Sequence, residues 1–112
     1  MNFKEATLLV EEYLRKSEAE INNFGCALPG YVYPNIKLRI INDQIKEYDF
    51  GWVFYYNSDK YLESKDINDM LVGNVPLIVD RNIEAIIETG TAHNSEYYIN
   101  NYIITGNPHQ EA

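Results

Sequence analysis

The sequence predicts an α+β fold: an antiparallel sheet of about four strands packed by an N-terminal helix and a C-terminal helix, with a short helix between strands 2 and 3. Two helical segments, residues 3–20 and 94–104, enclose a series of short apolar runs. Short turns join these runs in pairs, which makes consecutive strands antiparallel neighbours. The chain has 112 residues, and we expect residues 1–112 to form a single domain.

The N-terminal helix, within residues 1–21, is predicted by apolar side chains that recur every three or four positions. Asn2 and Glu5 have the spacing of a capping box, in which each side chain binds the other residue's backbone amide. The apolar stripe is made of Ala6, Leu9, Val10, Tyr13 and Leu14.

Residues 22–35, "NNFGCALPGYVYPN", are predicted to form a loop, because they hold two glycines, two prolines and three asparagines. Its aromatic side chains must either fold over the sheet, which is the commoner outcome, or contact a partner. The loop also holds the chain's one cysteine, Cys26, which cannot form an internal disulfide and therefore suits a reducing compartment.

Two strands are predicted at residues 36–47 and 52–58, joined by a hairpin turn at 48–51. The alternation in the first strand falters at Asn42-Asp43, where we expect a bulge or bend. In the second strand, "WVFYYNS", alternation places three side chains on one face and two on the other. The first set is Trp52, Phe54 and Tyr56, and the second is Val53 and Tyr55.

The stretch "KDINDMLVGNVPLIVD" (65–80), together with Glu63 and Ser64 just before it, suggests two different roles for its carboxylates. Glu63, Asp66 and Asp69 could cluster and carry out acid–base chemistry. However, Ser64 or Asp66 can also cap a short helix, with a glycine ending it and a proline opening the next strand. Because capping accounts for every residue type in the stretch, we predict no catalytic residues and no enzyme activity.

Two further strands are expected at residues 75–80 and 83–89, with a turn at Asp80-Arg81-Asn82. Residues 36–104 thus hold the sheet and the C-terminal helix, and 105–112 form a tail that we expect to fray. On the last helix, Tyr98, Ile99 and Tyr102 are expected to pack on the sheet, with the tyrosine hydroxyls reaching the surface.

The net charge of −8 is concentrated in residues 66–112, which hold seven acidic residues and one basic residue. An acidic surface repels nucleic acid and anionic membranes and attracts basic proteins, such as a nuclease, although acidity also serves solubility alone. No metal or cofactor motif occurs, and His93 and His109 are expected to lie apart. The apolar runs are too short for a membrane helix, and no signal peptide is evident, so a cytoplasmic location is expected.

Three ordered segments resemble the immunity protein 35 family of bacterial polymorphic-toxin systems. They are "GWVFYYNSDKYLES", "LVGNVPLIVD" and "GTAHNSEYYINNY", and together they span about half of the chain. The chain departs from the family pattern at three positions, all at turns or caps. Lys65 and Glu84 stand where the family commonly has glycine, and Asn94 stands where it has proline.

The resemblance implies a small cytoplasmic protein that neutralises a cognate toxin by direct, non-covalent binding. It also leaves open an alternative, a chaperone-like or general protein-binding module, and it says nothing about oligomeric state. It brings no catalytic, cofactor or metal residues. The shared motif residues are interpreted as fold determinants: Gly51, Trp52, Gly73, Asn74, Pro76, Asp80, Gly90 and Thr91.

For the partner-binding surface we predict four anchor residues. Tyr31 and Tyr33 are aromatic residues of the variable loop, and tyrosine is enriched at binding hot spots. Asp49 and Glu63 would contribute acidic contacts to a basic toxin.

Overall fold

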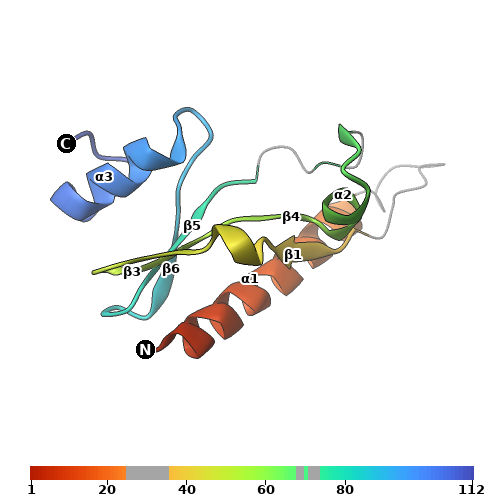
Figure 1. Ribbon diagram of the computed structural model, residues 1–112, viewed down its shortest axis with the longest axis horizontal. Coiled ribbons are helices and arrows are strands. Elements are labelled where there is room, and N and C mark those ends of the chain that lie inside the picture. Colours follow the sequence, from red (N-terminus) through yellow and green to blue (C-terminus); the bar gives the residue numbers. More distant parts are fainter. Residues whose placement is uncertain (25–35, 68–69, 71–73) are drawn as a thin grey trace.

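The computed structural model describes residues 1–24, 36–67, 70 and 74–112, and these residues form an α+β fold, as predicted (Figure 1). Three α-helices and one 3-10 helix, η2, accompany six short strands among them. In chain order the elements are α1 (Phe3–Phe24), β1 (Leu38–Ile40), η2 (Asn42–Gln44), β2 (Lys46–Tyr48), β3 (Gly51–Phe54), β4 (Tyr56–Ser58), α2 (Asp59–Ser64), β5 (Leu77–Asp80), β6 (Ala85–Glu88) and α3 (Ser95–Thr105).

The main sheet has four antiparallel strands in the order β2-β3-β5-β6, with a helix on each face. Helix α1 packs on the face that carries Trp52 and Phe54, and α3 packs on the face that carries Val53 and Ile78. Figure 1 shows the two helices on opposite sides of the strands. The alternation predicted for "WVFYYNS" is therefore confirmed, and the central strands β3 and β5 are buried on both faces.

Each of the first two predicted strands is divided into two. Residues 36–47 give β1 and β2, and residues 52–58 give β3 and β4; β1 and β4 pair separately as a two-stranded sheet. The division falls at η2, where the sequence predicted a bulge or bend. The hairpin remains connected there, because the Ile41 amide donates to the Tyr55 carbonyl oxygen at 2.8 Å.

Helix α1 starts at the predicted capping box, and it ends later than expected, at Phe24 rather than residue 21. The Asn2 side chain accepts from the Glu5 amide at 2.8 Å, and the Glu5 carboxylate accepts from the Asn2 amide at 3.1 Å. Near the other end, the buried Glu18 carboxylate accepts from the Leu38 amide at 2.7 Å. This bond holds α1 against β1 and saturates an amide at the start of the small sheet.

The short helix lies between β4 and β5, but it precedes the predicted cap instead of following it. Ser58 caps α2, since its side chain accepts from the Tyr61 amide, and Lys65 ends the helix in a left-handed conformation. Ser64, a predicted N-cap, is the last residue of α2. The Ser64 hydroxyl accepts from the Asp66 amide at 3.1 Å. The segment that Ser64 or Asp66 would cap, with Gly73 at its end, lies largely outside the described residues, so this cap stays a prediction.

The three departures from the family pattern have a structural explanation. Lys65 (φ 60°) and Glu84 (φ 52°) are the non-glycine residues with positive φ among those described. Glycine adopts this conformation without the steric cost that a β carbon brings. Asn94 caps α3 through its side-chain oxygen, which accepts from the Tyr97 amide at 2.9 Å.

Several of the family-motif residues make contacts that few other residue types could make. A β carbon on Gly51 would lie 1.9 Å from the Val79 carbonyl oxygen, and one on Gly90 would lie 2.6 Å from the Tyr98 hydroxyl. The Asn74 side chain donates to the Tyr56 carbonyl oxygen at 2.6 Å. The Pro76 carbonyl oxygen accepts from Thr89, Trp52 is buried, and Thr91 is exposed. That these residues determine the fold remains a prediction.

The C-terminal tail is not frayed. The Asn101 side chain is buried in α3 and donates to the Pro108 carbonyl oxygen at 3.1 Å, while its own oxygen accepts from the Ala112 amide at 3.1 Å. Pro108 is buried, and a His109 ring nitrogen lies 3.0 Å from the Glu88 carbonyl oxygen. The prediction was wrong because a buried asparagine needs hydrogen-bond partners, and the tail provides them.

Candidate functional site

The structure describes two of the four predicted anchor residues, and it places these two far apart. Tyr31 and Tyr33 lie outside the described residues. Asp49 is in the turn between β2 and β3, whereas Glu63 is on α2. These segments lie at opposite ends of a molecule 48 Å long (Figure 1). Asp49 and Glu63 therefore cannot belong to one small site.

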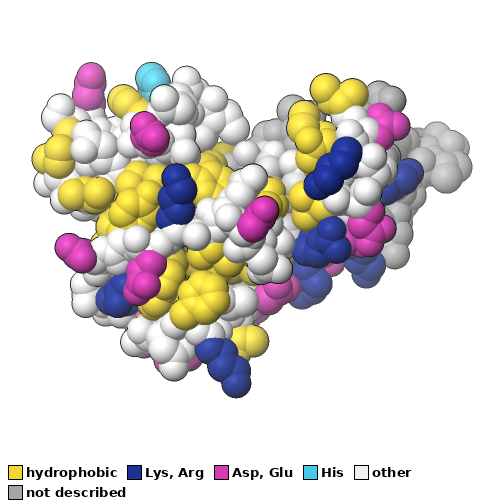
Figure 2. Space-filling view, in the orientation of Figure 1, with side chains coloured by type: hydrophobic (Ala, Val, Ile, Leu, Met, Phe, Trp, Pro, Cys, Tyr) yellow, Lys and Arg dark blue, Asp and Glu magenta, His cyan; other side chains and the backbone are white. Residues whose placement is uncertain are grey.

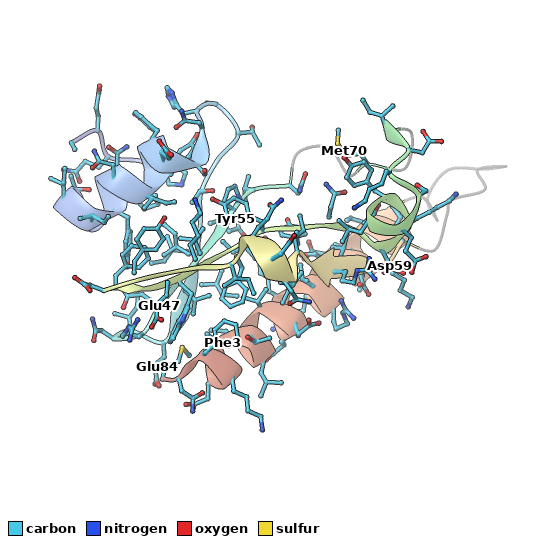
Figure 3. All side chains as sticks on the ribbon, in the orientation of Figure 1. Phe3, Glu47, Tyr55, Asp59, Met70 and Glu84 are labelled. Atoms are coloured by element: carbon cyan, nitrogen blue, oxygen red, sulfur yellow. The ribbon has the colours of Figure 1, made fainter. Side chains whose placement is uncertain are left out.

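The end of the molecule that carries Glu63 has mixed charge. Arg39 lies 3.0 Å from the Asp59 carboxylate and 3.9 Å from that of Glu63. In Figure 2, lysine and arginine side chains gather over α2 and β1, and Figure 3 shows Asp59 beside α2. Because its charges are largely compensated, this end offers little net attraction to a basic partner.

The end that carries Asp49 has a pocket of about 530 Å³, which we call the hairpin pocket. Three elements far apart in the sequence build it: the β2–β3 turn, the end of β5 and the C-terminal turn of α3. In Figure 2, apolar side chains gather between α3 and the strands. The described lining residues are Tyr48, Asp49, Phe50, Asp80, Tyr102, Ile103 and Gly106.

Aromatic rings form the walls of the hairpin pocket. The rings of Tyr48 and Phe50 stack, with centroids 5.1 Å apart and planes 5° from parallel. Phe50 also meets the edge of Tyr102, with centroids 5.1 Å apart and planes 72° apart. Such stacked and edge-to-face pairs stabilise one another by about 0.5–1.5 kcal/mol each beyond their buried area. The walls are therefore held in place by contacts within the fold.

A buried carboxylate, Asp80, forms the base of the pocket. One of its oxygens accepts from the amides of Asn82 and Ile83 at 2.8 and 3.2 Å, and the other accepts from the Tyr102 hydroxyl at 2.5 Å. Burial by itself raises the pKa of Asp80, but the hydrogen bonds, first that of Tyr102, and the Arg81 charge outweigh it and lower the pKa below its ordinary value. Burial and the Asp80 carboxylate raise the pKa of the Tyr102 hydroxyl. Asp80 is thus ionised and Tyr102 protonated near neutral pH.

The rim of the hairpin pocket is exposed and combines charge with apolar surface. Asp49 is exposed in the hairpin turn. Ile103 and its neighbour Ile104 are 58% and 62% exposed, although isoleucine is usually buried. Sequence reasoning singled out Asp49 but missed Ile103 and the pairing of Asp80 with Tyr102. The spacing of Tyr98 and Tyr102 identified their shared helix face, but the hydroxyl of Tyr102 points to Asp80 and not to the surface.

A second hollow, of about 580 Å³, lies beside the N-terminus. Arg81 lies in it, 3.0 Å from the Glu47 carboxylate, with its guanidinium 4.7 Å from the centre of the Trp52 ring. Figure 3 shows Phe3, Glu47 and Glu84 around this end of α1. Its arginine and carboxylate already pair with each other, so this hollow is a weaker candidate than the hairpin pocket.

The described residues hold few groupings suited to catalysis. Glu63 and Asp66 are exposed, and Asp69 lies outside the described residues. Among the residues with described positions, no three histidine, cysteine, aspartate or glutamate side chains gather closely enough to hold a metal ion. His93 and His109 were expected to lie apart. In fact, both imidazole rings pack against the Tyr98 ring, with ring centroids 6.0 Å and 5.7 Å away, respectively. No helix in the described part of the chain is both long and apolar enough to cross a membrane.

Comparison with known proteins gives one family and one curated relative. The family model described as "Immunity protein 35" matches residues 4–101, which is most of the chain. The chain is 37% identical over 54 residues to "Uncharacterized protein YrhB" of Escherichia coli (strain K12). That alignment covers 48% of this chain and 57% of the relative, so the chain spans little more than half of the relative's length. No solved structure matches.

Proposed function

The chain belongs to the immunity protein 35 family, and on this basis we propose that it neutralises one cognate bacterial toxin by direct, non-covalent binding. An immunity role in general follows from the family. The specific mechanism, a stoichiometric complex with one toxin, is our proposal. The observation that carries it is the family match over residues 4–101.

The charge and shape of the molecule support a binding role. The net charge is −8, and an acidic protein associates fastest with a basic partner because their fields attract at long range. The proposed toxin is therefore basic, and a nuclease fits this requirement. Exposed isoleucines beside a pocket at one end of the molecule offer the apolar contact area that complements charge in protein interfaces.

We further propose that the protein acts without catalysis and in the cytoplasm. Neutralisation by binding requires no bond to be broken, and the two buried carboxylates among the described residues have structural partners: Asp80 bonds Tyr102, and Glu18 bonds the Leu38 amide. The single cysteine suits a reducing compartment.

The test is co-expression with the product of the adjacent gene. We expect the toxin alone to stop growth, the pair to restore it, and the two purified proteins to form a 1:1 complex whose affinity falls as salt is raised. An adjacent product without toxicity, or toxicity that this protein does not relieve, would count decisively against the proposal.

The chaperone-like alternative makes a different prediction. A general binder would suppress the heat-induced aggregation of unrelated proteins such as citrate synthase at stoichiometric ratios. We expect no such suppression, because a dedicated inhibitor concentrates its binding energy on a few matched contacts.

A further inference from the structure

We propose that the hairpin pocket is the site that receives an arginine side chain of the toxin. A guanidinium suits three features of this pocket: its aromatic walls, the Asp80 carboxylate at its base and the Asp49 carboxylate at its rim. It rests on the proposed function for the identity of the partner. The chemistry of the pocket stands on the geometry alone and can be tested separately.

The aromatic walls favour a cation over a neutral apolar group. The face of an aromatic ring carries partial negative charge and attracts a cation within about 6 Å of its centre. Tyr48, Phe50 and Tyr102 all line the pocket. Because Phe50 stacks on Tyr48 and also packs against Tyr102, the ring face left for a cation is the outer face of Tyr48, a residue that is only partly buried. A planar guanidinium also stacks on such rings, which a lysine ammonium cannot do, so arginine fits better than lysine.

Asp80 supplies negative charge at the base of the pocket; the neighbouring Arg81 charge acts on it, but the groups that bond it directly are neutral. A carboxylate has about four acceptor positions, and three donors occupy those of Asp80: two backbone amides and the Tyr102 hydroxyl. All three donors are neutral, so the charge of Asp80 is stabilised but not cancelled by them. One acceptor position remains for an incoming N–H group.

The C-terminal end of α3 adds to the same field. Gly106 lines the pocket and ends this helix of 11 residues in a left-handed conformation. The last turn of a helix carries partial negative charge on its carbonyl groups. No basic residue occupies the last turn of α3 to neutralise that charge. The pocket therefore combines two carboxylates with a helix C-terminus.

The nearest basic side chains leave the pocket unfilled. No basic residue is among its described lining residues. Arg81 follows Asp80 directly, but its guanidinium lies against Trp52 and Glu47 and donates to the Tyr48 carbonyl oxygen at 2.8 Å, so its donors are engaged outside the pocket lining. Lys46 is two residues before Tyr48 and so shares its face of β2.

The first experiment uses a small probe and no toxin. NMR spectra of the whole protein are recorded during titration with N-acetyl-arginine amide, and separately with N-acetyl-citrulline amide, which has a similar shape but no charge. We expect saturable shifts at the amides of Asp49, Phe50, Ile103 and Gly106 with arginine only. Equal shifts with citrulline, or none at these amides, would overturn the proposal.

A matched pair of variants locates the effect. Asp49→Asn removes the rim charge and keeps a residue that suits a turn, and Asp43→Asn makes the same change on η2, outside the pocket. We expect Asp49→Asn to weaken arginine binding roughly two- to fivefold, the range for an exposed ion pair, and Asp43→Asn to leave it unchanged. Equal effects of the two substitutions would contradict a local site.

The second experiment separates this inference from the proposed function. Asp49→Lys and Asp43→Lys change the net charge equally, so we compare their affinities for the adjacent-gene product. We expect a loss of at least tenfold for Asp49→Lys, since it puts a like charge against the incoming arginine, and under threefold for Asp43→Lys. If the two variants lose affinity equally while the wild type binds, the pocket proposal fails and the proposed function stands. If the wild type does not bind, the proposed function fails and the arginine titration decides the pocket chemistry.

Discussion

Replacing Tyr102 with phenylalanine removes one hydroxyl and leaves a buried carboxylate oxygen of Asp80 without its donor. Both residues are buried, at 7% and 8% exposure, so solvent replaces the lost bond poorly. Hydrogen bonds to charged groups contribute about 1.5–3 kcal/mol. The entropy of unfolding is about 2.1 cal/mol/K per residue, which is about 0.24 kcal/mol/K for 112 residues. A loss of about 2 kcal/mol therefore lowers the melting temperature by roughly 8 °C.

The pH dependence of this loss identifies its origin. Because the pKa of Asp80 is lowered by folding, its stabilisation is present above the ordinary carboxyl pKa of about 3.9 and is lost as the pH falls through the lower folded value. The pKa of Tyr102 is raised, so its contribution is present below about pH 10 and is lost only as the pH rises through the raised value. We expect the free energy of unfolding of the wild type to exceed that of the variant by a constant amount from about pH 5 to 9. Below about pH 4 this difference should become smaller.

The assay is urea denaturation followed by circular dichroism across this pH range. Tyr98→Phe is the matched control: the Tyr98 hydroxyl accepts from the His93 amide at 3.2 Å, and no carboxylate among the residues with described positions bonds it. We expect Tyr98→Phe to lower the free energy of unfolding by about 0.5–1.5 kcal/mol, and we expect this loss to be the same in acid as at neutral pH. A difference for Tyr102→Phe that is below about 0.5 kcal/mol, or that persists unchanged in acid, would refute the reasoning.

Three further substitutions or deletions test the fold by the same denaturation measurement. Gly51→Ala is expected to lower the free energy of unfolding by more than about 4 kcal/mol, because its β carbon would lie 1.9 Å from the Val79 carbonyl oxygen; a loss below about 1 kcal/mol would show that the strand shifts easily. Glu84→Gly is expected to raise the free energy of unfolding by roughly 0.5–1 kcal/mol, because φ is 52° at this position and glycine adopts a positive φ without steric cost; any loss of stability would contradict this. Deleting residues 107–112 is expected to lower the free energy of unfolding by about 1–3 kcal/mol, because the buried Asn101 side-chain amide loses both partners; an unchanged denaturation midpoint would indicate that the tail is frayed.

Local patterns predicted the parts of the fold that local physics determines. The capping box at Asn2 and Glu5 needs only two side chains three residues apart, and the structure has it. Alternation along "WVFYYNS" assigned Trp52 and Val53 to opposite faces, and each packs under a different helix. These features follow from backbone periodicity, which does not depend on distant parts of the chain.

The remaining features depend on contacts between distant residues, which a single sequence does not display. The long hairpin divides at η2, and β1 packs on α1, where the Leu38 amide donates to Glu18, 20 positions earlier. The hairpin pocket needs Asp80 and Tyr102, which are 22 positions apart. Asp80 was identified only as a motif residue, because nothing local reveals the partner of a buried carboxylate.

The docked tail also affects the tendency of the protein to aggregate. Strand β6 is one edge of the main sheet, and an open edge can pair with the sheet of another molecule. The His109 ring occupies the carbonyl oxygen of Glu88, the last residue of β6. At the other edge, β2 is only three residues long and carries Lys46 and Glu47, and short, charged edges pair poorly. A tail that the sequence predicted to fray thus covers an acceptor through which the edge of one molecule could pair with another.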